Sequence, residues 1–330
     1  MYKLLYVLTS SDKDLYCEQC ILSIMSAKRN SPSAKISLLI DDITKKNIEA
    51  NSNRKQLFGI VDELVSVPRP NSFSAMETSR YLKTKMREFI KGDFLYIDSD
   101  TIVCDELKDI ENTPSDLCAV LDQHTSRSHN THAIIFQKHL ETISKAKEYL
   151  TYENYFNGGV LWVRDVESNH KFFDDWHNNW LYSRSKGMKI DMPALALANY
   201  QNKFAIQEID GSWNCQVWFG ANHLAKAKII HYFTSNTGFT EGYNQYSVTL
   251  PQKLKEGHKL TEADWDIIQN AKSAFPSPNA IITGADYEIY RSSLCGVLRA
   301  LYRRKKIFDF MEKLLYSIRI IRAKIMLKKK

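Results

Sequence analysis

The sequence lacks most of the features that mark secreted, membrane-spanning or zinc-binding proteins. Its 330 residues contain no apolar run close to the roughly 20 residues that cross a bilayer. The apolar stretch from Leu4 to Leu8 is short and has no small-residue cleavage site behind it, which favours a first strand over a signal peptide. The six cysteines are scattered, and Cys17-x-x-Cys20 lacks the second pair that a zinc site would need. These absences predict a cytosolic chain with reduced thiols.

Glycine and proline are also scarce. The chain has 12 and 8 of them, which leaves no room for a long flexible linker. Apolar residues make up 44% of the chain and charged residues 25%, as in ordinary globular proteins. The length therefore predicts one large α/β domain or two smaller ones.

Positive charge is concentrated at the C-terminal end, in a segment that we call the tail (residues 291–330). The whole chain carries +7, whereas the tail holds 13 basic and 2 acidic residues, so the remainder is slightly acidic. Apolar side chains recur in the tail at steps of three or four, at Ile307, Met311, Leu314, Ile318, Ile321 and Ile325. A basic amphipathic helix predicts binding to an anionic membrane surface, or else packing on the main domain. Its aromatic residues lie beside the apolar positions, which argues against nucleic acid as a partner.

Strands and helices alternate through the first 100 residues. Apolar runs predict strands at 3–9, 35–42, 64–68 and 94–97, and helical spacing fills the intervals between them. This order predicts a parallel, doubly wound sheet, in which ligands bind at the carboxyl ends of the strands. Polar residues stand at several of these predicted ends, namely Thr9, Ser10, Asp41, Asp42, Asp98 and Asp100.

Asp98-Ser99-Asp100 is the most informative of these groups. It follows the buried run Phe94 to Ile97, and residues two apart on an extended chain point the same way. Carboxylates so placed suit Mg²⁺ or Mn²⁺, which are often shared with substrate phosphates. The alternative is that the two acids only cap a turn or the next helix.

The second half continues with similar signals. Strands are predicted at 117–122, 157–164 and 227–233, the last carrying His231. Helices are predicted at 166–182 and 191–200, with Pro193 tolerated in the first turn of the second. Residues 252–271 are polar and predict a surface helix with loops.

Taken in order, these motifs resemble the metal-dependent nucleotide-sugar glycosyltransferases of the GT-A fold, and most of all glycosyltransferase family 8. The resemblance covers residues 3–235, and its motifs are Leu8–Ser10, Ser79–Lys85, Leu95–Val103, Phe156–Val160, Asp191–Leu195 and Ile229–Phe233. It implies an α/β GT-A-type doubly wound mixed sheet with a Rossmann-like nucleotide-binding half and a basic helical C-terminal extension. The expected division is a catalytic domain at 1–245 (nucleotide-sugar half about 1–105, acceptor half about 106–245), a connecting surface segment at 246–290 and the tail.

The resemblance also implies roles for matching residues. Asp98, Asp100 and His231 would hold Mn²⁺ or Mg²⁺, and the imidazole favours Mn²⁺ somewhat. The donor would contact Leu8, Thr9, Ser10, Arg80, Lys83, Asp98 and Ser99. The sugar and acceptor side would be shaped by Asn157, Gly158, Gly159, Asp191, Trp213 and Asn214.

The chain departs from family 8 at one place. The family usually has Asp-Gln where this chain has Asp191-Met192, so the polar group near the reacting carbon is absent. The stereochemistry therefore stays open, and Asp191 is the one candidate for a catalytic base. A catalytically altered nucleotide-sugar-binding protein is one alternative. A sugar-nucleotidyltransferase is another, although Thr9-Ser10-Ser11-Asp12 lacks the Gly and Arg expected of its phosphate loop.

The resulting expectation is a hexosyltransferase that moves a sugar from a nucleoside-diphosphate donor, by family usage UDP, to a glycan or lipid-linked acceptor. The tail and the resemblance together predict a role in bacterial surface polysaccharide synthesis. The expected location is the cytoplasm, peripheral on the inner face of the membrane.

Overall fold

The computed structural model describes the chain except residues 1, 131, 234–244, 274–288, 290–291 and 328–330, with side chains described up to Ile318. It divides into two compact units, residues 1–277 and 278–330. None of the described helices combines the length and the apolar composition that a bilayer span requires.

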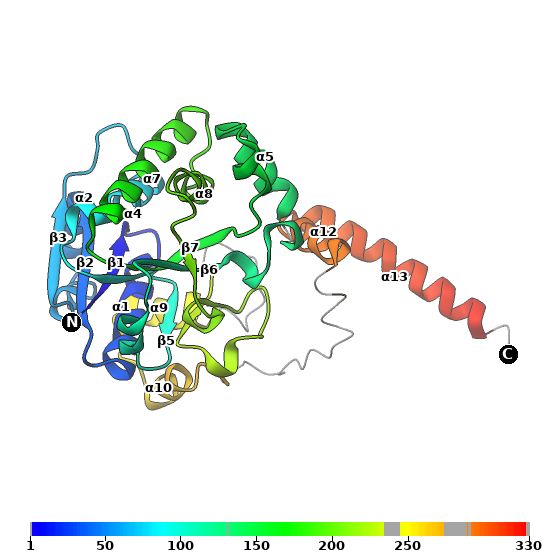
Figure 1. Ribbon diagram of the computed structural model, residues 1–330. Helices are drawn as coiled ribbons and strands as arrows, with labels where there is room; N and C mark the ends of the chain where they lie inside the picture. The colour runs from blue at the N-terminus through cyan, green and yellow to red at the C-terminus, as the bar shows by residue number, and fades with distance from the viewer. Residues whose placement is uncertain (1, 131, 234–244, 274–288, 290–291, 328–330) are drawn as a thin grey trace. The chain divides into compact units, whose positions relative to one another are not determined.

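A large mixed sheet forms the centre of the first unit (Figure 1). Its seven strands run in the order β3-β2-β1-β4-β7-β6-β8, with bounds β1 Lys3–Leu8, β2 Lys35–Asp41, β3 Glu63–Val67, β4 Phe94–Ile97, β6 Leu117–Leu121, β7 Phe156–Val163 and β8 Gln207–Glu208. The first four are parallel, whereas β7 is antiparallel to both β4 and β6. The parallel, doubly wound half that the sequence predicts is therefore present, and β7 makes the whole sheet mixed.

Helices cover both faces of this sheet (Figure 1). The first unit contains α1 Tyr16–Asn30, α2 Asp42–Glu49, α3 Gln56–Gly59, α4 Ala75–Phe89, α5 Ala133–Ile143, α6 Lys147–Thr151, α7 Glu167–Ser185, α8 Met192–Gln201, α9 Leu250–Lys255 and α10 Glu262–Gln269. Short 3₁₀ helices occupy Lys108–Asn112, Asp122–His124, Arg127–His129, η4 Gly211–Asn214 and Leu224–Lys226, and a π-helical turn occupies Gln245–Thr249.

Successive side chains of β1 point to opposite faces of the sheet and contribute to two hydrophobic cores. Leu4 and Tyr6 face a core that includes α1, whereas Leu5 and Val7 face a second core made with α4, α7 and α8. A buried strand with apolar residues on both sides is what a helix-covered sheet requires. Cys17 and Cys20 of α1 are fully buried in the first of these cores as free thiols.

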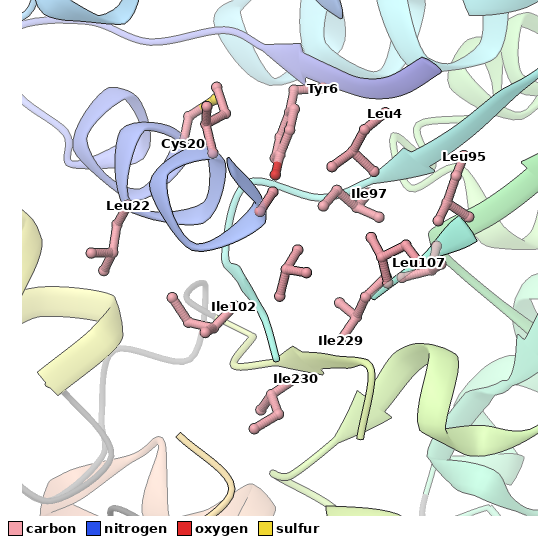
Figure 2. Close-up of a cluster of buried hydrophobic side chains, with 14 of the residues drawn as sticks. Leu4, Tyr6, Cys20, Leu22, Leu95, Ile97, Ile102, Leu107, Ile229 and Ile230 are labelled. Carbon is pink, nitrogen blue, oxygen red and sulfur yellow. The ribbon is translucent and has the colours of Figure 1, made fainter. Parts of the chain in front are cut away.

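A second, three-stranded sheet in the order β5-β10-β9 lies beside the first core. Its strands are β5 Thr101–Val103, β9 Cys215–Gln216 and β10 Ile229–His231. Figure 2 shows Ile102, Ile229 and Ile230 from this sheet packed with side chains of β1, β4 and α1. The motif Leu95–Val103 is thus divided between two sheets, because the chain turns at Ser99-Asp100 and then pairs with β10.

The region after β10 differs from the expected connecting surface segment. Residues 246–277 belong to the first unit, and Leu250, Leu254 and Ile268 are buried in its first core. Although this region is mostly polar, these three residues form a narrow apolar stripe that packs α9 and α10 against the core.

The second unit contains α12 Ser293–Tyr302 and α13 Lys305–Leu327. Both helices lie within the tail, for which the sequence predicts mostly helix. Several large apolar side chains are exposed there, among them Leu294, Val297, Phe310, Leu314 and Ile318. The side chains of Ile321 and Ile325 lie outside the described residues.

Candidate active site

Two aspartates are presented by the turn between β4 and β5. The Asp98 backbone N–H donates to Gly159 O of β7 at 2.8 Å, and Thr101 Oγ1 donates to Asp98 O at 2.8 Å. On the other side the Tyr232 N–H donates to Asp100 O at 3.0 Å. Backbone hydrogen bonds to both sheets therefore fix the turn that carries the two carboxylates.

His231 completes a three-residue cluster. The antiparallel register of β10 and β5 places His231 opposite Thr101, next to the turn. Its Nε2 lies 3.3 Å from Asp100 Oδ1 and 3.9 Å from Asp98 Oδ2. One ligand atom from each of the three residues lies within 4.8 Å of the others. Among the described residues this is the one such group of three, so the turn-capping alternative does not account for the arrangement.

The environment of His231 is dominated by negative charge. The ring is 3% exposed, and burial on its own would lower its pKa. The carboxylates of Asp100 and Asp98 outweigh burial and raise the pKa of His231 above its ordinary value. The same field that favours a proton here also favours a divalent cation, and two carboxylates with one imidazole suit Mn²⁺ or a related borderline ion.

A basic pair from α4 faces the aspartates. Arg80 and Lys83 are one helical turn apart, and Lys83 Nζ lies 3.4 Å from Asp98 Oδ1. Asp191 lies between the pair, with Oδ1 3.1 Å from Arg80 Nε and Oδ2 3.6 Å from Lys83 Nζ. Its side chain makes no capping hydrogen bond to α8, so it is not a simple helix cap.

Asp191 is held in its ionised form. Burial would raise the pKa of its carboxyl, but Lys83 and Arg80 reverse this and hold the pKa below its usual range. A carboxylate with a lowered pKa is a weaker proton acceptor. The geometry therefore favours an electrostatic or positioning role for Asp191 over that of a general base.

These groups line a cavity of about 430 Å³. Of the residues expected at the donor, Leu8, Thr9, Arg80, Lys83, Asp98 and Ser99 all line it. Ser10 does not line it, because its hydroxyl donates to Asp14 at 2.6 Å and its N–H donates to Thr44 at 3.0 Å. Ser10 shapes the loop behind the cavity instead.

The residues expected on the sugar and acceptor side divide into two groups. Asn157, Gly158, Gly159 and Asp191 line the cavity, as does Met192. Trp213 and Asn214 are not among its lining residues; Trp213 lies under Lys228, whose Nζ is 5.0 Å from the ring. Asn214 is fully buried and bonds to His231 Nδ1 at 3.0 Å.

Other lining residues were not singled out from the sequence. Asp14, Tyr16 and Met76 lie at the cavity, as does Phe233, whose ring stacks on His231 with centroids 4.1 Å apart. Phe233 stands two positions after His231, and alternation along a strand could have suggested it. The others come from loop and helix starts with no distinctive spacing.

Asp41 and Asp42 also stand outside the cavity. Asp41 is the N-cap of α2, where its carboxylate accepts from the backbone of Ile43 and Thr44. It also pairs with Arg69 at 2.9 Å. The acid at the end of β2 therefore caps a helix, whereas Asp98 at the end of β4 belongs to the cluster with Asp100 and His231.

Comparison with known proteins gives a consistent result. The sequence model described as glycosyl transferase family 8 matches residues 7–237. Galactosyltransferase LgtC, solved with donor and acceptor sugar analogues, is 14% identical over 81% of this chain and 99% of its own, with a TM-score of 0.49. Glycosyltransferase GlyE of Streptococcus pneumoniae TIGR4 is 18% identical over 86% of this chain and 67% of its own, with a TM-score of 0.47. Mouse xyloside xylosyltransferase 1 is 11% identical over 70% and 97%, with a TM-score of 0.46. The search of curated proteins found no match.

Proposed function

Because this chain belongs to glycosyl transferase family 8, and its mixed sheet has the GT-A arrangement, we propose that it is a divalent-cation-dependent enzyme that uses a UDP-sugar donor. That it is a glycosyltransferase follows from the family. The nucleotidyltransferase alternative finds no support in the comparisons. The observation that carries the proposal is the Asp98, Asp100 and His231 cluster, which lies in the same cavity as Arg80 and Lys83.

The charges in the cavity suit a nucleoside diphosphate. Asp98, Asp100 and His231 would hold the cation, which when bound neutralises charge on the diphosphate. Lys83 and Arg80 present positive charge on the same side, where the leaving group gains a negative charge. The bond between the anomeric carbon and the β-phosphate oxygen breaks toward UDP. A bond to an acceptor hydroxyl oxygen forms, and that hydroxyl loses its proton.

Met192 lies in the cavity where the family usually has a glutamine. Its thioether offers no hydrogen bond to the sugar. Asp191 has a lowered pKa. Asp14, the other carboxylate among the described lining residues outside the ligand cluster, already accepts hydrogen bonds from the Ser10 and Ser11 hydroxyls. We therefore propose that the acceptor attacks on the face from which the diphosphate leaves, and that its proton passes to an oxygen of the departing diphosphate rather than to Asp191. Attack from the opposite face would place the acceptor away from these oxygens and would need a separate base.

We further propose that the acceptor is a glycan or a lipid-linked molecule and that the protein works at a membrane surface. Such an acceptor would be within reach of a protein whose tail binds the membrane. The exposed apolar side chains of α12 and α13 lie among basic residues, which supports binding to anionic lipid on the cytoplasmic face. A role in surface polysaccharide synthesis follows from that location. Sedimentation with anionic vesicles, with and without residues 304–330, tests the tail, and equal binding by the two proteins would contradict it.

The central experiment is calorimetric titration of UDP in the presence and absence of Mn²⁺. We expect UDP binding that depends on Mn²⁺ and that is lost in Asp98→Ala and Asp100→Ala. Asp42→Ala is the matched control, since Asp42 is a strand-end acid outside the cavity. Affinity for UDP that is unchanged in Asp98→Ala would contradict the proposal. Hydrolysis across a panel of UDP- and GDP-sugars then identifies the donor.

A further inference from the structure

A chain of buried amides leads from β6 to the metal-ligand histidine. Asp122, directly after β6, accepts from Asn157 Nδ2 at 2.8 Å. Asn157 Oδ1 accepts from the Gly159 backbone N–H at 2.9 Å and from Asn214 Nδ2 at 3.0 Å. Asn214 Oδ1 faces His231 Nδ1 at 3.0 Å. All four side chains of this chain are at most 4% exposed.

The orientation of each amide follows from its neighbour. A backbone N–H can only donate, so the Asn157 atom that faces Gly159 is the carbonyl oxygen. That oxygen can only accept, so the Asn214 atom that faces it is the amide nitrogen. The Asn214 oxygen is then left for His231.

This order also determines the proton on the imidazole. An amide oxygen only accepts, so Nδ1 of His231 must carry the hydrogen toward Asn214. In the neutral ring Nε2 then has its lone pair directed at Asp98 and Asp100, where a cation would sit. The opposite tautomer would place a hydrogen in the metal position and two lone pairs against each other.

We propose that Asn214 is a positioning residue that holds His231 in the tautomer and ring orientation that bind the cation. The inference rests on the metal dependence proposed above. Asn214 does not line the cavity, so any effect on metal binding passes through its two hydrogen-bond partners, His231 and Asn157. The chain of hydrogen bonds also gives Asn157 a positioning role, because its oxygen accepts from both Gly159 and Asn214.

The fold explains why the residue is placed there. Asn214 ends η4 immediately before β9, and β9 pairs in parallel with β10 in the register that sets Gln216 beside His231. The small sheet thus brings the amide against the inner nitrogen of the ring. Partners of this kind set the basicity and orientation of metal-bound histidines.

The test has two measurements. The first is titration of Mn²⁺ alone, followed by the electron paramagnetic resonance of the free ion. Asn214→Leu keeps the number and branching of the side-chain heavy atoms but removes both hydrogen bonds, and we expect the Kd for Mn²⁺ to rise about 10- to 100-fold. Asn169→Leu is the matched control, because Asn169 is equally buried and donates to two carbonyls away from the cavity. We expect it to lose comparable stability and to keep the wild-type Kd.

The second measurement is the tautomer itself. Long-range ¹H–¹⁵N spectra at alkaline pH, with the His231→Gln variant to assign the signal, should show hydrogen on Nδ1 in the wild type and a mixture in Asn214→Leu. The wild-type spectrum needs no folded variant at Asn214. Hydrogen on Nε2 in the wild type, or an unchanged Mn²⁺ Kd in a folded Asn214→Leu, would overturn the proposal. If the wild type binds no Mn²⁺, the proposed metal dependence fails, and the tautomer still decides the role of Asn214.

Discussion

Gly159 lies at the point where the metal ligands and the amide chain meet. A Cβ added there would lie 2.5 Å from His231 Cε1, 2.8 Å from Asp98 Oδ2 and 2.9 Å from Asn157 Oδ1. Contacts under 3.0 Å are essentially never seen for a real Cβ, so the imidazole would have to move by at least about 0.5 Å. Metal sites tolerate roughly ±0.2 Å in their ligand distances. We therefore expect Gly159→Ala to disturb the cation site before it disturbs the fold.

The expected size follows from the cost of overpacking. One methyl group forced into a tight interior costs about 1–3 kcal/mol. If the crowding is relieved by displacing His231 or Asp98, the same free energy is lost from cation binding, which is a factor of about 5 to 150 in Kd. If the crowding is relieved by movement of other residues, the free energy of unfolding decreases instead and the Kd stays unchanged. The assay is Mn²⁺ titration combined with urea unfolding of the same preparation.

The neighbouring glycine provides the control. A Cβ at Gly158 would lie 3.6 Å from Lys83 Nζ and 3.7 Å from Leu195 Cδ2, which are ordinary contacts. Gly158→Ala should therefore bind Mn²⁺ as the wild type does. Neither glycine has a positive φ, so the two variants differ in packing alone. Equal Mn²⁺ affinity in the wild type, Gly158→Ala and Gly159→Ala, with equal stability, would refute this reasoning about the site.

Two further predictions concern stability. Arg54 and Glu18 are each 1% exposed and paired at 2.6 Å, so Arg54→Met leaves an unpaired buried charge and should cost about 3–5 kcal/mol in urea unfolding. Adding Glu18→Met should recover much of this cost, and a double variant as unstable as the single one would contradict the account. Burial lowers the pKa of His177 from 6.5 to about 4, so below pH 6.5 the unfolded chain binds a proton that the folded protein does not. The free energy of unfolding of the wild type should therefore fall relative to that of His177→Asn as the pH drops from 6.5 toward 4. If the free energies of unfolding of the two proteins change in parallel with pH, this role of His177 is wrong.

Local patterns were enough to predict most of the sheet. The apolar runs at β1, β2, β4, β6 and β7 are short, continuous and bounded by polar residues, which is the pattern of a strand covered on both faces. The capping box of Ser74 and Glu77 marks the start of α4 in the sequence itself. Asp98 and Asp100 could be found in the same way, because two acids at a strand end are a local feature.

Other elements depend on contacts between distant residues. The split of Leu95–Val103 into β4 and β5 is caused by pairing with β10, more than 120 residues later. The burial of α9 depends on contact with α1, and its sequence alone looks like surface. A short apolar stripe on a helix does not show which part of the protein will cover it.

The sequence by itself determined where the strands of the first half lie along the chain, the pair of aspartates and the basic face of α4, because each is a pattern within a few neighbouring residues. It also supplied His231 as a candidate, through the order of motifs. Only the tertiary structure decided that Asn214 faces this histidine and not the acceptor, and that Asp191 is held ionised between Arg80 and Lys83. The physical reason is that tautomers, pKa values and ligand geometry depend on atoms a few ångströms apart. The residues that supply these atoms are far apart in sequence, as Asp98 and His231 are, at 231 − 98 = 133 positions.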